Sequence, residues 1–478
     1  MPHFHEDLVI EVRRLPDTQE STRKLLADAA ARGANYLDSL ESRPVFPRDA
    51  DVERLRAALA GDMPAEPTPD AEVLAFLDEF GTPATVASAG GRYFGFVTGG
   101  ALPATVASHM LATAWDQNSF SFISSPATAL FDETALRWLK ETFGLPPAAE
   151  GALVLGASAA NVTGLAAARH EVLRRAGWNV EEQGLRGSPE VTVIVGEEAH
   201  GTIFKILPLL GFGRAHIHSV PVDDQGRMRA DVLPAIRGPA IVCIQAGNVN
   251  SGAFDPAVEI IPRAHEAGAW VHVDGAFGLW AAASEKRRHL TQGFADADSL
   301  ATDAHKWLNV PYDCGIVFVR EPAALRAAMS ISGDYLLLGK HRDAIDITTD
   351  GSRRARGIDV WAALRSLGRR GLAAMIDRNC DQARWLAERL RAAGAEVLND
   401  VVLNQVVVAF GDDERTRRVI TALQESRECW CGGTRWHGRE AMRVSVSSWA
   451  TTQQDIERTL KSLIDALQRS FGQRAPSR

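Results

Sequence analysis

The amino-acid sequence predicts an α/β protein with a large, mostly parallel sheet, a smaller C-terminal α+β domain and a helical N-terminal segment. Three observations predict this fold. Between about residues 100 and 330, short apolar runs alternate with longer stretches of helical periodicity. Several of these runs are apolar without alternation, as expected when helices cover both faces of a parallel sheet. After about residue 340, long helical stretches and isolated strands replace this alternation, which indicates a separate, smaller domain.

The first predicted part is a helical segment over residues 1–85. Residues 21–40 have helical periodicity, and Pro64, Pro67 and Pro69 mark a connection between helices. Such a segment buries little apolar surface by itself. We therefore expect it to pack on another domain or, in a dimer, on a second subunit.

The second part, residues 86–340, is predicted to be the large domain. Its expected strands are residues 152–155, 191–195, 241–244, 270–273, 299–302 and 316–319. In such a domain the ligand site lies at the carboxyl ends of the strands. The third part, residues 341–478, is predicted to contain a helix over 359–391, strands over 401–410 and 442–446, and a closing helix over 452–468.

Composition is that of an ordinary globular protein, with 46% hydrophobic and 23% charged residues. The formal charge of −8 includes no long block of one sign, which argues against nucleic-acid or electrostatic membrane partners. No apolar stretch reaches the roughly 18 residues that a membrane span needs, and the charged N-terminus lacks the apolar core of a signal peptide. Five scattered cysteines predict neither a disulfide framework nor a metal site. The expected location is the cytoplasm.

Lys306 and Asp274 are the most informative pair of residues. An apolar predicted strand ends in Asp274, and Lys306 follows the next strand in the run from Asp303 to Leu308. A lysine can form an imine with an aldehyde, and a buried carboxylate can hold a ring nitrogen protonated, as pyridoxal phosphate chemistry requires. A carboxylate at a strand end can equally pair with an arginine or with backbone donors. The pair alone leaves both interpretations open.

A possible phosphate site follows the first predicted strand of the large domain. Gly156, Ala157 and Ser158 form a small-residue turn before a helix, where free N–H groups and the helix dipole favour an anion. An ordinary strand–turn–helix with a serine cap has the same pattern. His200 ends another strand, where its imidazole could lie over a cofactor ring or simply face solvent. The segment 246–256, by itself, indicates only a turn.

Together, these motifs resemble the group II pyridoxal-phosphate-dependent amino-acid decarboxylases, which have fold type I, the aspartate aminotransferase fold. The resemblance covers roughly residues 85–460. Its motifs are residues 93–100, 156–161, 200–205, 246–256, 272–278, 297–308 and 352–361. Several separate motifs in family order are far more specific than any one of them, and they favour the functional interpretation of each. The resemblance implies a seven-stranded type of sheet in the large domain.

The resemblance also implies roles for residues around the cofactor ring. Lys306 would form the Schiff base with pyridoxal 5′-phosphate, and Asp274 would pair with the pyridinium nitrogen. His200 would stack on one face of the ring while Ala276 packs against the other. Asn248 stands where the family usually has a threonine near the O3′ atom of the cofactor.

A second group of matched residues concerns the phosphate and the partner subunit. Ala157, Ser158 and His305 are expected to bind the phosphate. Phe120 and Ser352 match positions that reach the cofactor across a dimer interface. A homodimer with shared active sites is therefore expected.

Three departures from the family pattern are visible. The second glycine of the phosphate loop is replaced by Ala157. Asp303 stands where asparagine is common, and because a carboxylate would be repelled by a phosphate, direct contact between them is not expected. Between residues 336 and 351 the chain has no tyrosine, although aromatic decarboxylases of this family carry one on a mobile loop that reprotonates the substrate carbon. His341 is the only imidazole in that stretch.

The expected reaction is decarboxylation of an L-amino acid to its amine, with Lys306, His200 or a loop residue as proton donor. Aromatic or bulky apolar substrates are favoured by the side chains expected at the site entrance, which are Tyr93, Phe94, Phe96, Phe120 and Trp280. Arg443 is a candidate for binding the substrate carboxylate in a bidentate manner, and a surface salt bridge is the equal alternative for it.

Three other functions stay open at the level of sequence. The same site could carry out decarboxylation-dependent oxidative deamination to an aldehyde, which the missing loop tyrosine motivates. It could also be a carbon–carbon lyase or a transaminase. The third is a catalytically silent scaffold that retains the fold, against which the intact Lys306, Asp274 and His200 argue.

Overall fold

The computed structural model describes residues 18–330 and 341–472. The chain divides into two compact units, Met1–Ala87 and Ser88–Arg478. Within the described ranges, no helix combines the length and the apolar character that crossing a membrane requires.

The first unit is helical, as predicted. Its elements are α1 (Thr18–Ser39), α2 (Asp49–Ala58), α3 (Asp70–Phe76), the π-turn η1 (Leu77–Gly81) and α4 (Thr82–Ala84). Arg32 of α1 bridges Asp28 on its own helix and Asp78 of η1, at 3.1 and 2.7 Å. No side chain of α2 or α3 is buried. This unit therefore keeps much apolar surface exposed.

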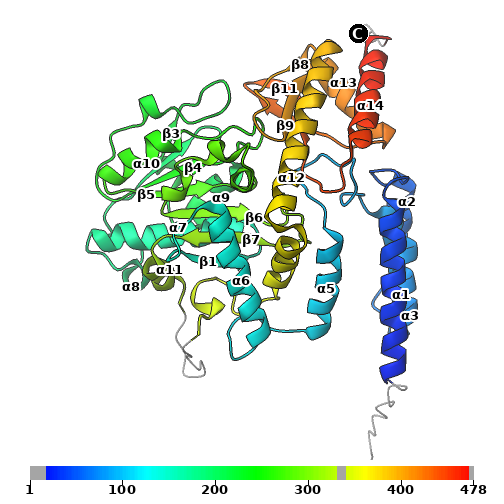
Figure 1. The fold of residues 1–478 in the computed structure, drawn as a ribbon, viewed down its shortest axis with the longest axis horizontal. Coiled ribbons are helices and arrows are strands. Elements are labelled where there is room, and N and C mark those ends of the chain that lie inside the picture. Colours follow the sequence, from blue (N-terminus) through cyan, green and yellow to red (C-terminus); the bar gives the residue numbers. More distant parts are fainter. Residues whose placement is uncertain (1–17, 331–340, 473–478) are drawn as a thin grey trace, which may run out of the picture. The chain divides into compact units, whose positions relative to one another are not determined.

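The second unit is built on a seven-stranded sheet, shown in Figure 1. Its strands are β1 (Glu150–Val154), β2 (Thr192–Gly196), β3 (Ile217–Val220), β4 (Ala240–Gln245), β5 (Trp270–Asp274), β6 (Ser299–Asp303) and β7 (Gly315–Val319). Their order is β1-β7-β6-β5-β4-β2-β3, and only β7 runs antiparallel to its neighbours. Six strands lie where the sequence predicts them. Strand β3 was missed, because this edge strand exposes His218 and Ser219 and so has no apolar run.

Helices cover both faces of this sheet, which is why its strands are continuously apolar. Strand β4 shows the effect most clearly: Ile241 and Cys243 join one apolar cluster, and Val242 and Ile244 join the other. The first cluster includes α7 (Ala157–Arg175), α9 (Gly201–Leu209) and α11 (Pro322–Met329). The second includes α6 (Pro126–Phe143), α10 (Ala257–Glu266) and part of α12 (Arg356–Ala392).

Helix α12 continues from the large sheet into the C-terminal region, which appears in orange and red in Figure 1. The helix is interrupted at Gly368, whose φ of 59° is left-handed. Its first part packs on α5 (Pro103–Trp115) and α6, and its second part packs on a small antiparallel sheet. The predicted boundary at residue 340 stays a prediction, since one helix serves both regions.

The small sheet has the order β10-β11-β9-β8. Its elements are β8 (Glu396–Val397), β9 (Gln405–Ala409), β10 (Gly432–Trp436) and β11 (Arg439–Ser445), with helices α13 (Asp413–Ser426) and α14 (Gln453–Gly472). The α+β character is confirmed. The strand predicted over residues 401–410 is shorter, because Asn404 bends the chain and donates its side-chain amide to the Val446 carbonyl at 3.0 Å.

The remaining short helices lie in the connections of the second unit. They are α8 (Val180–Gln183), η2 (Arg214–His216), η3 (Ala230–Val232), η4 (Gly278–Ala283), η5 (Arg288–Thr291), η6 (Phe294–Asp296) and η7 (Ala344–Asp346). Of these, η4 matters most for the site, because it follows β5 and carries Trp280 beneath the end of β6.

Candidate active site

The predicted site residues gather at the carboxyl edge of the central strands. Strand β5 ends at Asp274 and β6 ends at Asp303, while the connections after β2 and β4 carry His200 and Asn248. The parallel register pairs Gln245 of β4 with Asp274, which brings these strand ends to one edge of the sheet. This is the position that a mostly parallel α/β sheet offers to a ligand.

Asp274 is buried, with only 6% of its surface exposed. Its Oδ1 atom accepts the backbone N–H of Ala276 at 3.3 Å. Burial raises the pKa of this carboxyl group, while the nearby His200 and Lys306 act in the opposite direction. No arginine forms an ion pair with Asp274 anywhere in residues 18–330 or 341–472, so the carboxylate is available to a ring nitrogen.

Lys306 lies in the turn after β6, and its Nζ atom is 3.0 Å from Oδ2 of Asp303. Two sets of contacts hold the backbone of this turn in place. Gly99 packs directly on the Lys306 carbonyl oxygen, which a Cβ at position 99 would approach to 1.7 Å, so glycine is required there. Asn309 donates its side-chain amide to the carbonyls of Trp307 and Ser447, at 2.8 and 3.1 Å. The lysine therefore extends from a fixed backbone.

His200 caps the N-terminus of α9, where its Nδ1 atom lies 2.7 Å from the Thr202 hydroxyl. One side of the ring is exposed to solvent, and the surrounding protein nevertheless lowers the pKa of the imidazole by desolvation. Asp274 raises that pKa, whereas Lys306 and Arg443 lower it further. Asp274, Lys306 and Arg443 therefore lie near His200 inside the site.

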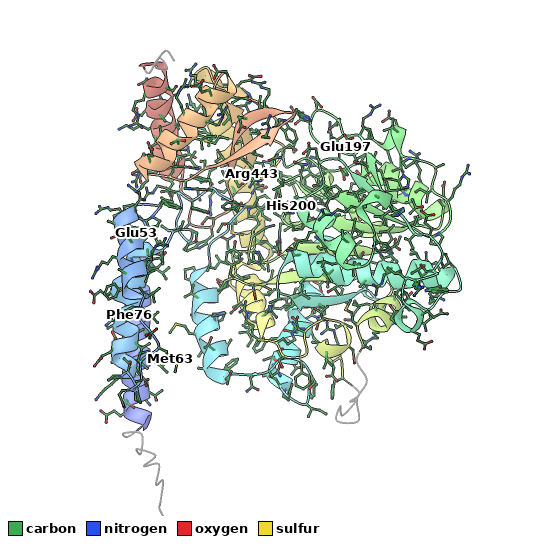
Figure 2. All side chains as sticks on the ribbon, turned by 180° about the vertical axis from the view of Figure 1, so that it is seen from behind. Glu53, Met63, Phe76, Glu197, His200 and Arg443 are labelled. Carbon is green, nitrogen blue, oxygen red and sulfur yellow. The ribbon has the colours of Figure 1, made fainter. Side chains whose placement is uncertain are left out.

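Arg443 comes from β11 of the small sheet and lies near enough to His200 to lower the pKa of its imidazole; both residues are labelled in Figure 2. Its Nη1 atom donates to the Val249 carbonyl at 2.9 Å, and burial lowers the pKa of the guanidinium. In the described part of the chain Arg443 forms no ion pair, so the surface salt bridge considered for it is absent there. The small sheet thus supplies a cation to the site.

The residues predicted to bind phosphate lie at the N-terminus of α7 and at His305. The N–H of Ala157 donates to Oδ1 of Asp303 at 2.5 Å, and His305 Nε2 lies 3.6 Å from the same oxygen. His305 Nδ1 accepts the Cys314 N–H at 3.1 Å, and burial lowers the pKa of the imidazole. Ser158 is exposed beside them. The structure therefore places Asp303 against the N–H that is expected to bind phosphate.

Asn248 is buried, and its side chain organises the connection after β4. Its Oδ1 atom accepts the N–H groups of Asn250 and Ser251, at 2.8 and 3.2 Å. Its Nδ2 atom donates to the Glu198 carbonyl at 3.2 Å, which ties this loop to the segment leading to His200. A contact of Asn248 with the cofactor stays a prediction.

Three aromatic side chains, Tyr93, Phe96 and Trp430, contact one another and form what we call the aromatic wall. Tyr93 stacks on Trp430 with ring centroids 5.1 Å apart, and Phe96 lies 5.3 Å from Trp430. Phe96 is 64% exposed and has a left-handed φ of 53°, a strained conformation that often marks functional positions. Trp430 was not singled out from the sequence, since it joins the wall only through tertiary contact.

Two aromatic residues expected at the site entrance lie elsewhere. Phe94 is 1% exposed and packs in the apolar cluster of the small domain, because it points opposite to its neighbours in an extended segment. Trp280 is fully buried, and its Nε1 atom donates to the Asp303 carbonyl at 2.9 Å. The expectation that Trp280 lines the entrance is corrected: it supports the end of β6 from the core.

Sequence reasoning also passed over two residues next to His305 and Asp274. Tyr312 is exposed, and its ring centroid lies 4.4 Å from that of His305. His272 is fully buried behind the site, with its ring nitrogens 2.8 Å from Ser299 Oγ and from Asn161 Oδ1. Asn161 and His272 both stand inside recognised motifs, and this was the signal that could have found the contact.

The residues predicted to act across a dimer interface stay predictions. Phe120 is partly buried, and its carbonyl accepts the Ile345 N–H at 3.0 Å. Ser352 is exposed, and His341 stacks on Phe122 with ring centroids 3.7 Å apart. Residues 336–340 of the loop that lacks a tyrosine lie outside the described residues.

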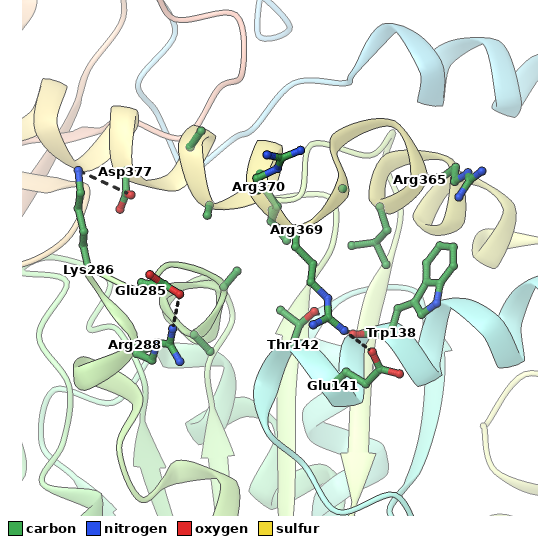
Figure 3. Close-up of a pocket in the computed structure, with 17 residues that line it drawn as sticks. Trp138, Glu141, Thr142, Glu285, Lys286, Arg288, Arg365, Arg369, Arg370 and Asp377 are labelled. Atoms are coloured by element: carbon green, nitrogen blue, oxygen red, sulfur yellow. Dashed lines mark hydrogen bonds and ion pairs between the residues drawn. The ribbon is translucent and has the colours of Figure 1, made fainter.

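A cavity of about 910 Å³ lies apart from these residues, at the interruption of α12 (Figure 3). Several of its charged side chains pair with one another. Arg369 lies 2.6 Å from Glu141, and Arg288 lies 3.0 Å from Glu285. None of the predicted site residues lines it.

Metal and thiol chemistry find no support among the residues that the structure describes. No group of three or more histidine, cysteine or acidic side chains is placed to hold a metal ion. All five cysteines are buried free thiols. Burial raises the pKa of Cys243, Cys314 and Cys380 to about 12, which keeps these thiols protonated and unreactive.

The residues at the strand ends fit a phosphorylated pyridine aldehyde such as pyridoxal 5′-phosphate. Lys306 offers an amine for the aldehyde, and Asp274 offers a carboxylate without an arginine partner for the ring nitrogen. The N-terminus of α7 offers N–H donors for a phosphate. Gly156 leaves space beside the N-terminus of α7, because a Cβ at position 156 would lie 3.2 Å from the His305 ring.

Comparisons with known proteins agree with this donor set. Residues 87–410 match the family model of the pyridoxal-dependent decarboxylase conserved domain. The chain is 27% identical to tryptophan decarboxylase 1 of Oryza sativa, over 91% of each chain. It is also 27% identical to the aromatic-L-amino-acid decarboxylase of Bacillus atrophaeus, over 78% of this chain and 77% of that one.

The fold agrees as well. The crystal structure of Catharanthus roseus tryptophan decarboxylase in complex with L-tryptophan superposes with a TM-score of 0.84 at 22% identity, covering 95% of this chain and 100% of that one. Oryza sativa TDC, solved with PLP and tryptamine, gives a TM-score of 0.87 at 24% identity, covering 95% and 99%. The chain therefore belongs to the pyridoxal-dependent decarboxylase family, as an enzyme whose cofactor is pyridoxal phosphate.

Proposed function

We propose that this enzyme decarboxylates an L-amino acid with an aromatic side chain to the corresponding amine. One observation carries the proposal. The segment that bears Tyr93 and Phe96 continues to Gly99, which packs on the carbonyl of Lys306. The aromatic wall is thereby joined to the turn that holds the reactive amine. Curated relatives that act on aromatic amino acids support the same substrate class.

Pyridoxal phosphate supplies an aldehyde that condenses with amines and a protonated ring that accepts the electron pair of a breaking bond. The protein supplies the remaining parts. Lys306 would hold the aldehyde, and Asp274 would keep the proton on the ring nitrogen, because an ionised carboxylate in a buried site stabilises that positive charge. In our proposal His200 and Ala276 enclose the ring, while Ala157, Ser158 and His305 bind the phosphate.

The substrate is oriented by a cation and by aromatic surface. Arg443 lies near His200 and keeps donors beyond its single bond to Val249, so we assign it to a carboxylate of the substrate. Phe96 and Tyr93 would contact the aromatic side chain. The carboxylate leaves as CO₂, and one proton must reach the substrate carbon. Lys306 and His200 are our candidates for the group that delivers this proton.

A second outcome deserves its own measurement, because residues 336–351 contain no tyrosine. Without a tyrosine on this loop to protonate the substrate carbon, that carbon could instead be oxidised by O₂. The balance is then one amino acid, one O₂ and one water consumed, with aldehyde, CO₂, ammonia and H₂O₂ formed. Oxygen consumption therefore separates this reaction from simple decarboxylation.

We also propose that the enzyme is a homodimer with shared active sites. In the second unit Leu111, Trp115, Ile123 and Leu130 are exposed on α5, α6 and the segment between them, and these apolar side chains suit a subunit interface. Phe120 lies in the same segment, and Ser352 follows η7. Five free buried cysteines suit a reducing compartment, which supports a cytoplasmic location.

The substrate proposal is tested with the purified protein and added pyridoxal phosphate. Each of the common L-amino acids is assayed for CO₂ release, amine formation and oxygen consumption. We expect the aromatic amino acids to be the best substrates, with one amine formed per CO₂ and no oxygen consumed. Preference for an acidic amino acid would contradict the substrate class, and stoichiometric aldehyde with oxygen uptake would establish the oxidative reaction instead.

The dimer is tested by sedimentation and by mixing inactive variants. Lys306→Ala and Phe120→Ala homodimers are mixed after mild dissociation. Shared sites predict that the mixture regains part of the activity, because some mixed dimers contain one site with both native residues. A monomeric protein with full activity would contradict the proposal.

A further inference from the structure

Asp303 is the residue of the site that neither the family pattern nor the proposed reaction explains. It is 2% exposed and contacts three groups assigned to the cofactor. Its Oδ1 atom accepts the Ala157 N–H at 2.5 Å and lies 3.6 Å from His305 Nε2. Its Oδ2 atom lies 3.0 Å from Lys306 Nζ. An anion thus already sits at the end of α7 where a second anion is expected.

The backbone of Asp303 is fixed on both sides. Its N–H donates to the Ala276 carbonyl at 3.0 Å, and its carbonyl accepts Trp280 Nε1 at 2.9 Å. Strand pairing with Gly315 holds the same residue from the other direction. The carboxyl group can therefore break its hydrogen bond with the Ala157 N–H only by rotating about its own side-chain bonds. Even after such a rotation it stays beside the position expected for the phosphate.

Binding of the cofactor changes the charges around this carboxyl group in one direction. The phosphate brings negative charge to the N-terminus of α7, which Asp303 now occupies. At the same time the Lys306 amine is drawn to the aldehyde and away from Oδ2. Loss of a cation and gain of an anion both favour the neutral form of a carboxylic acid.

The other titratable groups around Asp303 are few. Lys306 and His305 come from the turn after β6, Asp274 from the end of β5, and His200 from the N-terminus of α9. The charge of Asp313 also acts on His305 and raises the pKa of its imidazole. Helix α7 contributes the Ala157 N–H, and η4 contributes the Trp280 N–H to the backbone.

We propose that Asp303 competes with the cofactor phosphate for the Ala157 N–H, and that pyridoxal phosphate binds together with one proton that Asp303 shares with the phosphate. The proton comes from solvent, and no covalent bond changes at Asp303. This inference rests on the assignment of Ala157 to the phosphate in the proposed function. Asp303 is thus a positioning residue that links occupancy of the site to pH.

The test compares cofactor affinity of the full-length protein with that of Asp303→Asn and Asp303→Ala between pH 6.5 and 9. Asparagine removes the charge, keeps the shape and adds a donor, whereas alanine removes the whole carboxyl group. We expect both variants to bind pyridoxal phosphate at pH 8 at least about tenfold more tightly, since adjacent like charges repel by more than that factor. The logarithm of the wild-type dissociation constant should rise by about one unit more per pH unit than that of Asp303→Asn.

Two controls separate charge repulsion from a general effect on the site. Pyridoxal lacks the phosphate, so the ratio of its dissociation constants for wild type and Asp303→Asn should be the same at every pH. Asp313→Asn removes a nearby carboxylate that does not touch Ala157, and its pH dependence should follow wild type. Calorimetry in two buffers of different ionisation enthalpy should show about one more proton taken up by wild type than by Asp303→Asn.

Borohydride reduction and peptide mapping identify where the cofactor binds. A reduced adduct on Lys306, with equal pH dependence and equal proton uptake in wild type and Asp303→Asn, would overturn this inference and leave the proposed function intact. An adduct on another residue would overturn both.

Discussion

Two sides of the active site are built in different ways. The cofactor floor, which we define as Asp274, Asp303, Lys306 and Ala157, comes from strand ends and the start of a helix. Backbone N–H groups donate to the carboxylates of Asp303 and Asp274 at 2.5 and 3.3 Å, and Lys306 Nζ lies 3.0 Å from Asp303 Oδ2. The aromatic wall comes from two distant segments, contacts itself mainly through stacked rings, and exposes 64% of Phe96.

The difference follows from what each side must do. The floor has to keep an amine, a carboxylate and phosphate donors in one fixed geometry, because small displacements of reacting groups are costly. The wall has to offer apolar surface to a side chain that enters from solvent, and many arrangements of rings can do this. Cofactor identity is therefore encoded in short local motifs, whereas substrate identity depends on how distant segments meet.

The largest effect is expected when the amine of the cofactor floor is removed. Lys306→Ala should abolish both activity and the borohydride-reducible adduct, because no other amine is held at this position. Reduction with borohydride followed by peptide mass spectrometry measures the adduct, and Lys205→Ala, which removes an exposed lysine of α9, is the control. A reducible adduct that persists in Lys306→Ala would place the reactive amine elsewhere.

Asp274→Asn tests the charge partner of the ring nitrogen. An amide cannot stabilise the positive charge of the protonated ring, so kcat should fall by about 10³-fold, the order seen when one preorganised electrostatic group is removed. Steady-state kinetics with saturating cofactor measure the effect. Near-normal turnover would show that the floor does not act as an electron sink through Asp274.

His272 tests whether the floor is supported by a neutral histidine behind it. Burial lowers the pKa of His272 to about 3, below its usual value of 6.5, so the unfolded chain binds the proton more tightly. Stability is therefore fully present above pH 6.5 and is lost as pH falls toward 3. Between pH 7 and 5 the free energy of unfolding should drop by about 2 kcal/mol from this group alone.

Denaturant unfolding at the two pH values measures this loss. In His272→Gln the pH dependence should be weaker by about the same 2 kcal/mol. His216→Gln removes an exposed imidazole and should leave the wild-type dependence unchanged. Equal dependence in wild type and His272→Gln would mean that His272 is not held neutral.

The aromatic wall should give the smallest effect. Phe96→Ala removes exposed apolar surface, so kcat/KM for aromatic amino acids should fall about tenfold, with little change in cofactor binding. Phe46→Ala, at an exposed position of the N-terminal unit, is the control. A loss of equal size for small and aromatic amino acids would show that Phe96 supports the floor and does not select the substrate.

The fold was predictable where strands are buried on both faces. All six residues of β4 are buried and the first five are apolar, so this strand was evident from the sequence. Strand β3 was not, because it lies at the sheet edge and exposes polar side chains. In the small domain, β10 begins with Gly432 and Gly433 and shows no strand pattern, and it is held in place by pairing with β11.

The site was predictable only in part, for a related reason. Residues inside one motif, such as Asp274 with Ala276, could be placed together from their spacing. The bond from Ala157 to Asp303 joins residues 146 positions apart, and the Tyr93 bridge to Trp430 spans a still longer separation. Sequence spacing carries no information on such pairs, and so Phe94 and Trp280 were expected at the entrance although both are buried.

By itself, the sequence determined the α/β class, because this class depends on local apolar runs. Together with the family motifs it also predicted Lys306 and Asp274 as the reactive lysine and its partner carboxylate, because each of them ends or follows such a run. Tertiary structure alone decided that Asp303 occupies the N-terminus of α7, that Arg443 of the small sheet lies near His200, and that Trp430 completes the aromatic wall. The physical reason is that strand formation is a local property of the chain, whereas the contacts of strand ends depend on sheet order and on docking of the small domain.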